Sequence, residues 1–280
     1  MIRATEADVP AILACLEQRP ELSMFPQANL ARFKLDGDHD YAPSMWIARN
    51  DAGQVTDVLT VARNGSVMPY LPSGDFASAA AVLRGRKLIG LIGPAQWARP
   101  LMEAASLSGC PASLDRDEPH FLLDLAKLSL PDGPGTLHPL QTGGIERMSN
   151  WYIAYDMEAL GASPEAARRN RTKATLTYIR NDSHRVLMED GEPLCITGFN
   201  AQLSRIVQVG GVFTPPERRG RGLARRAVAL HLAEARARGV VAATLFSASE
   251  AASKAYVSIG FAEVGRFTLC LFEKPERPYG

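Results

Sequence analysis

Hydrophobic positions along the chain alternate between the 3.6-residue spacing of amphipathic helices and the short apolar runs of strands. Residues 7–18 place Ile12 and Leu16 on one face of a helix, and residues 240–246 are an unbroken apolar run, as in a strand buried on both faces. The same reading predicts helices at 73–83, 94–106, 149–160, 163–178, 222–238 and 248–260, and strands at 46–48, 55–63, 87–92, 184–189, 193–200, 205–214 and 262–272.

This mixture of strands and helices predicts an α/β or α+β fold rather than a helical bundle. A chain of 280 residues is long enough for two domains. The clearest boundary is the proline and glycine cluster at residues 131–135. We therefore expect an N-terminal domain at 1–130, a linker at 131–136 and a C-terminal domain at 137–280.

Composition narrows the class of protein. Apolar residues make up 46% of the chain and charged residues 22%, the balance of a soluble globular protein. The net charge of +1 provides no general attraction for nucleic acid or an anionic membrane, so neither is expected as a partner. The four cysteines are far apart and fit no zinc or redox spacing, so no metal is expected. No secretion signal or membrane-spanning run is visible, and we expect a cytoplasmic protein.

One local sequence carries chemistry. Residues 218–226 contain five arginines and follow a predicted strand, with a predicted helix directly after them. A helix N-terminus presents free backbone N–H groups and a positive dipole end, and Gly220 and Gly222 let phosphate oxygens approach the backbone. Arg219 and Arg221 add positive charge. The alternative is a solvated basic turn, but it does not account for the strand before the loop and the helix after it.

The residues around this loop resemble a known family. Residues 212–224 resemble the acetyl-CoA motif Gln/Arg-x-x-Gly-x-Gly/Ala of the GNAT superfamily of N-acyltransferases. Residues 249–261, with Tyr256 four positions before Gly260, resemble the later helix of that superfamily. The resemblance covers about half of the chain. Two departures are Glu217 at the first motif position and Ser249 where many members have asparagine.

The resemblance implies a site for acetyl-CoA and a role for Tyr256. In the family, the strand before the loop pairs with the pantetheine arm, and a tyrosine on the later helix protonates the departing thiolate. The residues that would contact the cofactor here are Val212, Phe213, Thr214, Arg219, Gly220, Arg221, Gly222, Leu223, Ala224 and Ser249. The alternative interpretation of Tyr256 is a core tyrosine, because it lies on the apolar face of its helix.

The general base is less clearly marked. An amine is protonated at neutral pH and must lose a proton before it attacks a thioester. Glu158 is the first candidate, because in this fold its helix would border the acceptor side. Glu189 and Glu192 are further candidates, and a water relay without a dedicated base is an alternative.

The N-terminal half resembles a degenerate copy of the same fold, as in tandem GNAT proteins. It begins with the similar sequence at residues 2–8 but has no Arg-Gly-x-Gly loop, so CoA binding is not expected there. The expected architecture is thus two GNAT-like domains, each a mixed, mostly antiparallel twisted sheet flanked by helices.

The function expected from these residues is the transfer of an acetyl group from acetyl-CoA to a primary amine of a small molecule or peptide. A non-catalytic acyl-CoA sensor or partner protein is one alternative. A tandem-domain aminoacyl or thiol-ligand transferase is another. The sequence is compatible with a monomer or a homodimer.

Overall fold

The structure is a computed structural model that describes residues 1–278. The chain divides into two compact units, which we call the first unit (Met1–Glu118 with Gly265–Gly280) and the second unit (Pro119–Val264). This division differs from the one expected from the sequence. The expected linker, 131–136, lies inside the second unit, and the end of the chain belongs to the first.

The first unit is a sheet with strand order β1-β2-β3-β4-β5-β12, in which β4 and β5 are parallel and the other recorded pairs are antiparallel. Its elements are β1 (Ile2–Arg3), α1 (Val9–Leu16), α2 (Met24–Phe33), β2 (Pro43–Arg49), β3 (Val55–Ala62), β4 (Ser66–Tyr70), α3 (Phe76–Leu83), β5 (Leu88–Pro94), α4 (Ala95–Ala104), the start of β6 (Ala112–Asp124) and most of β12 (Ala262–Glu276). Helices α3 and α4 pack against each other.

The second unit has strand order β6-β11-β10-β9-β8-β7, in which β10 and β11 are parallel and the other pairs antiparallel. Its elements are the end of β6, β7 (Thr136–Pro139), α5 (Ile145–Ala159), α6 (Pro164–Arg168), α7 (Arg171–Arg180), β8 (His184–Glu189), β9 (Glu192–Gln202), β10 (Ile206–Phe213), α8 (Leu223–Ala237), β11 (Ala242–Phe246) and α9 (Glu250–Val257). The mixed, mostly antiparallel sheet flanked by helices confirms the predicted fold class.

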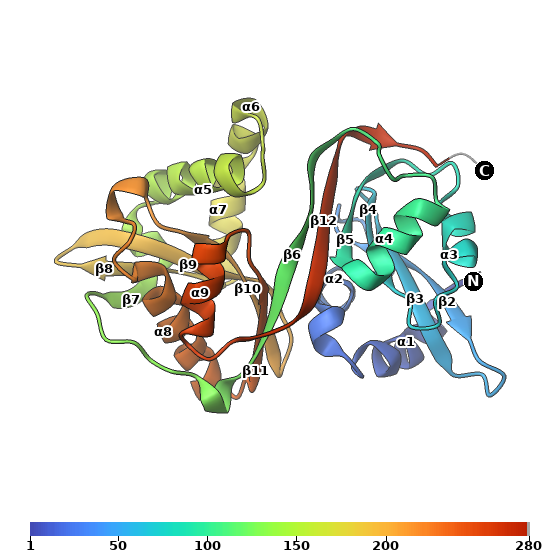
Figure 1. The fold of residues 1–280 in the computed structure, drawn as a ribbon, viewed down its shortest axis with the longest axis horizontal. Helices are drawn as coiled ribbons and strands as arrows, with labels where there is room; N and C mark the ends of the chain where they lie inside the picture. Colours follow the sequence, from blue (N-terminus) through green and yellow to red (C-terminus); the bar gives the residue numbers. More distant parts are fainter. Residues whose placement is uncertain (279–280) are drawn as a thin grey trace. The chain divides into compact units, whose positions relative to one another are not determined.

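The two units follow the same element order, strand for strand and helix for helix, apart from the division of one helix into α6 and α7 (Figure 1). Their last strands are exchanged along the chain. Strand β5 pairs antiparallel with β12, which lies at the end of the chain. Strand β11 pairs antiparallel with residues 120–124 of β6, which lies near the middle of the chain. Each sheet is therefore completed by a strand from the other half of the sequence.

Helices cover both faces of the second sheet, as side-chain alternation along β8 shows. Val186 packs in an apolar cluster with Tyr152 of α5, whereas the next residue, Leu187, packs in a cluster with Leu223 and Ala227 of α8. Because adjacent strand residues point to opposite faces, α5 and α8 lie on opposite sides of the sheet. The site described below lies where β10 leads into α8.

The prediction of a single helix at 163–178 is wrong, because the chain forms two helices there, α6 and α7. Asn170 adopts a left-handed conformation (φ 58°) between them, which ends helical hydrogen bonding. Asparagine tolerates this conformation better than most residues because its short side chain can bond locally. The break turns α7 and allows Arg171 to reach Asp156 on α5, at 2.6 Å.

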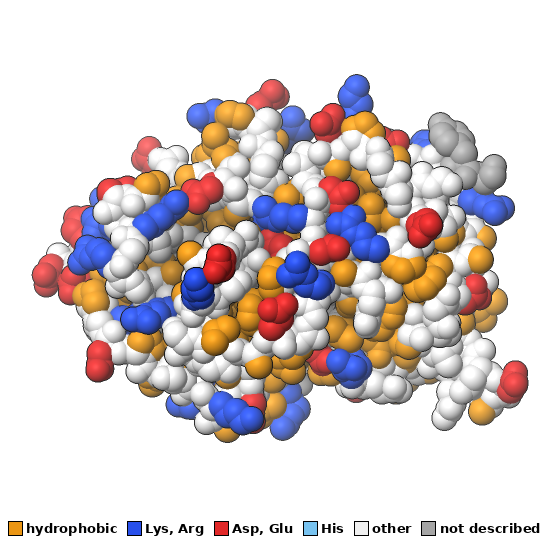
Figure 2. All heavy atoms as spheres, in the orientation of Figure 1, with side chains coloured by type: hydrophobic (Ala, Val, Ile, Leu, Met, Phe, Trp, Pro, Cys, Tyr) orange, Lys and Arg blue, Asp and Glu red, His pale blue; other side chains and the backbone are white. Residues whose placement is uncertain are grey.

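Charges of both signs are mixed over the face drawn in Figure 2, in keeping with the net charge of +1. Within residues 1–278, no helix combines the length and the apolar character that crossing a bilayer requires. In the same residues, no group of three or more histidine, cysteine or acidic side chains is placed to hold a metal ion.

Candidate active site in the second unit

Strand β10 leaves one of its edges open beside β11. The parallel ladder between them runs from Ile206 to Gln208 on β10 and ends opposite Thr244. Beyond that point β11 continues to pair with β6, while β10 remains paired with β9 through two register shifts. The residues of β10 after Gln208 thus present backbone N–H and C=O groups that no neighbouring strand of the described chain uses on that side. Such an edge can pair with an extended ligand.

A glycine is required at the second register shift. Gly211 adopts φ +61°, and a Cβ atom there would lie 3.2 Å from Cε1 of Tyr152 and 3.4 Å from Nε2 of His184. Both the left-handed backbone and the crowding disfavour any larger residue. The bulge at 210–211 bends β10 away from a regular ladder, which is a recurrent device next to binding sites.

The loop after β10 places two further glycines before α8. Gly220 (φ +77°) and Gly222 (φ +73°) both adopt the left-handed conformation, and Gly222 is the N-cap of α8 without a side-chain cap. Among the described residues, the N–H groups of Gly220, Arg221 and Gly222 donate no hydrogen bond to another protein group. Together with the free N–H groups of the first turn of α8, they form a ready site for an anion.

The arginines around this loop have different roles. The side chains of Arg218, Arg221 and Arg225 form no ion pair or hydrogen bond with another of the described residues, so their charge is available to a ligand. Arg226 instead donates to the carbonyl oxygens of Pro131, Pro134 and Gly135, at 2.7 to 3.1 Å. It therefore holds the segment before β7 against α8.

Arg219 is held at the end of β10. Its Nε donates to the carbonyl oxygen of Thr214 at 2.9 Å, and its guanidinium lies 5.7 Å from the ring centroid of Phe213. Its Nη2 also donates to Oε2 of Glu158 on α5, at 2.7 Å. Both partners are about half exposed, so the pair contributes little to stability. The structure thus brings the predicted base next to the loop rather than next to the bulge.

Helix α9 carries the two remaining residues predicted from the sequence. Ser249 is its N-cap, and its hydroxyl accepts a hydrogen bond from the N–H of Ala252 at 3.2 Å. Tyr256 is 8% exposed, and its ring meets Phe261 edge to face. It belongs to the same apolar cluster as Val209 of β10, and Val212 packs against that cluster. The same cluster includes Val228 and Leu232 of α8, so the tyrosine lies on the face of the sheet that α8 covers.

A buried polar cluster behind the bulge was missed by the sequence reasoning. His184 stacks on Tyr178 with ring centroids 3.9 Å apart, and Tyr152 meets both rings edge to face. Burial lowers the pKa of His184 to about 3 and raises the pKa of Tyr152 well above its ordinary value. The hydroxyl of Tyr152 and Nε2 of His184 have no hydrogen-bond partner in the described chain. In the sequence these residues are 32 positions apart, and no local motif connects them.

In the first unit, the loop between β4 and α3 corresponds to the glycine loop before α8, and a carboxylate lies at the start of its helix. The loop between β4 and α3 contains Ser73, whose N–H donates to Asp57 at 2.9 Å. The N-cap of α3 is Asp75, whose carboxylate accepts from the N–H of Ser78 at 3.0 Å. Because the Asp75 carboxylate occupies the helix end, it repels a second anion there. The contrast with the uncapped end of α8 indicates that an anionic cofactor would select the second unit.

Comparison with known proteins identifies the family of this region. A family model described as the acetyltransferase (GNAT) family matches residues 145–261, which include α5, the loop and α9. This is a GNAT acetyltransferase domain. The match spans the open edge of β10, the glycine loop and Tyr256, as expected from the sequence resemblance. A search of curated proteins found no match.

Solved structures share the fold over nearly the whole chain. A Drosophila protein has 14% identity and a TM-score of 0.67, with 96% of this chain and 97% of that one covered. A GCN5-related N-acetyltransferase from Sphaerobacter thermophilus has 14% identity and a TM-score of 0.58, with 100% and 96% covered. A tandem GNAT protein from the clavulanic acid biosynthesis pathway has 17% identity and a TM-score of 0.53, with 96% and 97% covered. At these identities the comparison shows the fold alone.

Proposed function

We propose that the GNAT domain transfers the acetyl group of acetyl-CoA to a primary amine of a small molecule or peptide. The observation that carries the proposal is the uncapped N-terminus of α8, where three unused N–H groups and unpaired arginines follow an open strand edge. A pyrophosphate matches the charge and donors of the helix end, and an extended pantetheine arm matches the strand edge.

The cofactor contacts follow from this arrangement. The backbone of residues 212–214 would pair with the pantetheine arm, and the N–H groups of residues 220–224 would bind the pyrophosphate. Arg221 adds a free cation at the loop, and Arg219 lies beside it. The hydroxyl of Ser249 caps α9 and can still donate a hydrogen bond, because a hydroxyl both accepts and donates.

Transfer requires little more than positioning and one proton donor. The neutral amine attacks the thioester carbonyl carbon, the carbon–sulfur bond breaks, and the departing thiolate takes up a proton. The attacking nitrogen gives up one proton to a base or to water, which balances the proton donated to the thiolate. Backbone N–H groups on the open edge of β10 can stabilise the negative charge that develops on the carbonyl oxygen. We assign the proton donation to Tyr256, whose ring shares an apolar cluster with β10.

Two roles remain for Glu158. As the proposed general base it would accept the proton of the amine, but its carboxylate is paired with Arg219 at the end of β10. The residues from the bulge at 210–211 to Thr214 span about 10 Å of extended chain. A carboxylate at the loop is therefore better placed to hold Arg219 toward the cofactor than to reach an amine at the bulge. Glu189 and Glu192, on β8 and β9, remain further candidates for the base.

We propose that the first unit is a degenerate copy of the same domain that does not bind CoA. Its matching element order, apart from the divided helix, supports duplication, and Asp75 at the N-terminus of α3 supports the loss of cofactor binding. We also propose a cytoplasmic location for the protein, as a monomer or homodimer.

The experiment that tests the function follows free thiol while the protein is incubated with acetyl-CoA and a panel of primary amines. Amine-dependent release of CoA thiol supports the proposal, and mass spectrometry of the product then identifies the N-acetylated amine. Tight binding of acetyl-CoA without thiol release from any amine would instead support a non-catalytic acyl-CoA sensor. Release that requires an aminoacyl or thiol acceptor would support the tandem-domain ligand transferase.

A further inference from the structure

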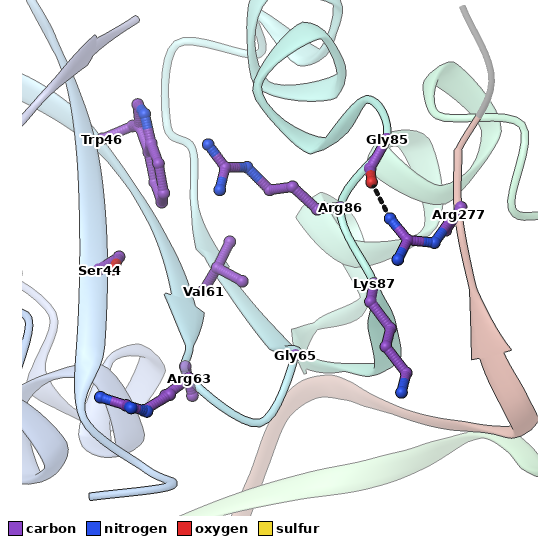
Figure 3. A pocket seen from close by; sticks show the side chains of 10 residues that line it. Ser44, Trp46, Val61, Arg63, Gly65, Gly85, Arg86, Lys87 and Arg277 are labelled. Atoms are coloured by element: carbon purple, nitrogen blue, oxygen red, sulfur yellow. Dashed lines mark hydrogen bonds between the residues drawn. The ribbon is translucent and has the colours of Figure 1, made fainter. Parts of the chain in front are cut away.

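The first unit contains a groove that the proposed function does not use. It has a volume of about 320 Å³, at the lower end of the range for small-ligand sites. Strands β2 and β3 form one side, and the turns before β4 and β5, with the residue after β12, form the other (Figure 3). The residues that line it are Ser44, Trp46, Val61, Ala62, Arg63, Gly65, Gly85, Arg86, Lys87 and Arg277.

The lining of this groove is strongly basic. Four of its ten residues carry positive charge, and none carries negative charge. Arg63 pairs with Asp38 at 3.2 Å, but both side chains are exposed and such a pair is weak. Lys87 forms no hydrogen bond or ion pair with another of the described residues. Arg277 donates to the carbonyl oxygen of Gly85, a neutral partner.

Two guanidinium groups lie against Trp46 in the wall of the groove: Arg86 from the lining, and Arg3, which lies outside the lining and pairs with Asp36 at 2.9 Å. Arg86 lies 4.3 Å from the ring centroid of Trp46, and Arg3 lies 5.3 Å from the same ring. Figure 3 shows the Arg86 side chain directed toward Trp46 across the groove. Burial and the charge of Arg3 lower the pKa of Arg86. Its Nε donates to the neutral carbonyl oxygen of Val82 at 2.7 Å, and it forms no ion pair with a carboxylate among the described residues. A bound anion would supply a charged partner.

The groove is distinct from the cofactor cleft of the fold. It lies at the start of the parallel strands β4 and β5, beside Gly65 and Lys87. The loop that corresponds to the pyrophosphate loop follows the end of β4 and contains Asp75. The two places are at opposite ends of β4, so the groove is not a remnant of a second acetyl-CoA site.

We propose that this groove binds the phosphate group of a small molecule. Arginine presents a planar fork of donors that matches phosphate oxygens, and lysine adds a compact charge. Arg86 and Lys87 approach the groove from the turn before β5 and Arg277 from the residue after β12, so the groove offers cationic donors from two segments of the chain. Trp46, whose indole is 6% exposed at the wall, gives the organic part of a phosphate ester a small apolar contact.

The test is isothermal titration of the full-length protein with inorganic phosphate and with glucose 6-phosphate at constant ionic strength. The variant Lys87→Gln/Arg277→Gln should weaken binding of both probes at least tenfold. The matched control Lys274→Gln/Arg84→Gln removes the same charge from exposed positions outside the groove and should leave binding unchanged. Lys87→Gln alone removes a side chain without a recorded partner, so it tests the groove without a risk to folding.

A tighter complex with glucose 6-phosphate than with inorganic phosphate would identify an organic phosphate as the ligand, and equal binding would identify free phosphate. Either result supports the proposed phosphate site if the Lys87 variants lose this binding. Absence of binding to the wild type, or binding unaffected by these variants, overturns the proposal. Loss of binding on Arg221→Gln instead would place the anion at the loop of the GNAT domain and also overturn it. The outcome does not depend on whether acetyl transfer is found.

Discussion

At the scale of single residues, the proposed proton donation rests on the hydroxyl of one nearly buried tyrosine. Tyr256 is nearly buried on α9 and packs beside Phe261. Removal of its hydroxyl leaves the ring and its packing in place. A change in rate without a change in stability would therefore report on proton donation alone.

We expect Tyr256→Phe to lower kcat by about 10²- to 10⁴-fold, the range for loss of a general acid. The KM for acetyl-CoA and the melting temperature should stay close to those of the wild type. Tyr41→Phe is the control, because Tyr41 is half exposed in the first unit and loses the same hydroxyl. A strong loss of melting temperature and cofactor affinity in Tyr256→Phe would show a structural hydroxyl instead.

Glu158→Gln separates the two roles of that residue. Loss of a positioning carboxylate should raise the KM for acetyl-CoA a few fold, with little change in kcat and no change in the shape of the pH–rate profile, because Arg219 loses its partner at 2.7 Å. Loss of a general base should lower kcat by about 10²-fold or more and remove the acidic limb of the profile. Steady-state kinetics across pH decides between them, and Glu165→Gln, also exposed on the neighbouring helix α6, is the control.

At the scale of elements, α8 contacts the sheet through an unusual core residue. His231 is fully buried and stacks on Phe199 of β9, with ring centroids 3.8 Å apart. Neither ring nitrogen has a hydrogen-bond partner in the described chain, and burial lowers the pKa of His231 well below its ordinary value. The ring is therefore neutral in the folded protein and becomes protonated when the chain unfolds in mild acid.

This difference predicts the acid sensitivity of the second unit. Below about pH 6.5 the unfolded chain binds more protons than the folded one, so stability rises with pH in that window and is lost as the pH falls. Each such histidine contributes about 1.4 kcal/mol per pH unit. His231→Leu should lessen the fall in stability between pH 6.5 and 5, with a change in slope that approaches about 1.4 kcal/mol per pH unit at the acid end, measured by urea unfolding. An unchanged slope would show that His231 titrates normally.

The sequence predicted those elements that are set by residues close together along the chain, and it missed contacts between distant residues. The glycine loop, α8, β11 and α9 were predicted because a strand, a glycine turn and a helix follow one another along the chain. Strand β4 was missed because it is short and contains Pro69, and α2 and β6 lack clear periodicity. The pair between Glu158 and Arg219 joins residues 61 positions apart, which no local pattern reveals.

At the scale of the whole molecule, the exchanged strands make each unit depend on both halves of the sequence. Residues 120–124 pair with β11, and Phe121 and Leu123 are buried in the core of the second unit. The sequence boundary at 131 would separate these residues from that core. Each fully buried side chain of this size is worth about 1.5–3 kcal/mol.

We therefore expect the fragment 119–264 to fold and the fragment 137–280 to aggregate. The fragment 137–280 lacks the partner of β11 and retains β12 without β5, so both strands have exposed edges. Circular dichroism and size-exclusion chromatography of the two fragments measure the difference. A soluble, cooperatively melting fragment 137–280 would contradict the dependence on exchanged strands.

The most direct test of the account is the titration of acetyl-CoA into the wild type and into Gly220→Val by calorimetry. Gly239→Val is the matched control, since Gly239 lies at the other end of α8, also at positive φ and with no atom near its Cβ position. Both substitutions carry a similar backbone cost of about 1–2 kcal/mol, but only position 220 lies at the predicted pyrophosphate site. The account predicts one acetyl-CoA per chain for the wild type and Gly239→Val, and at least tenfold weaker binding for Gly220→Val. Two molecules per chain, or unchanged affinity in Gly220→Val, would contradict it.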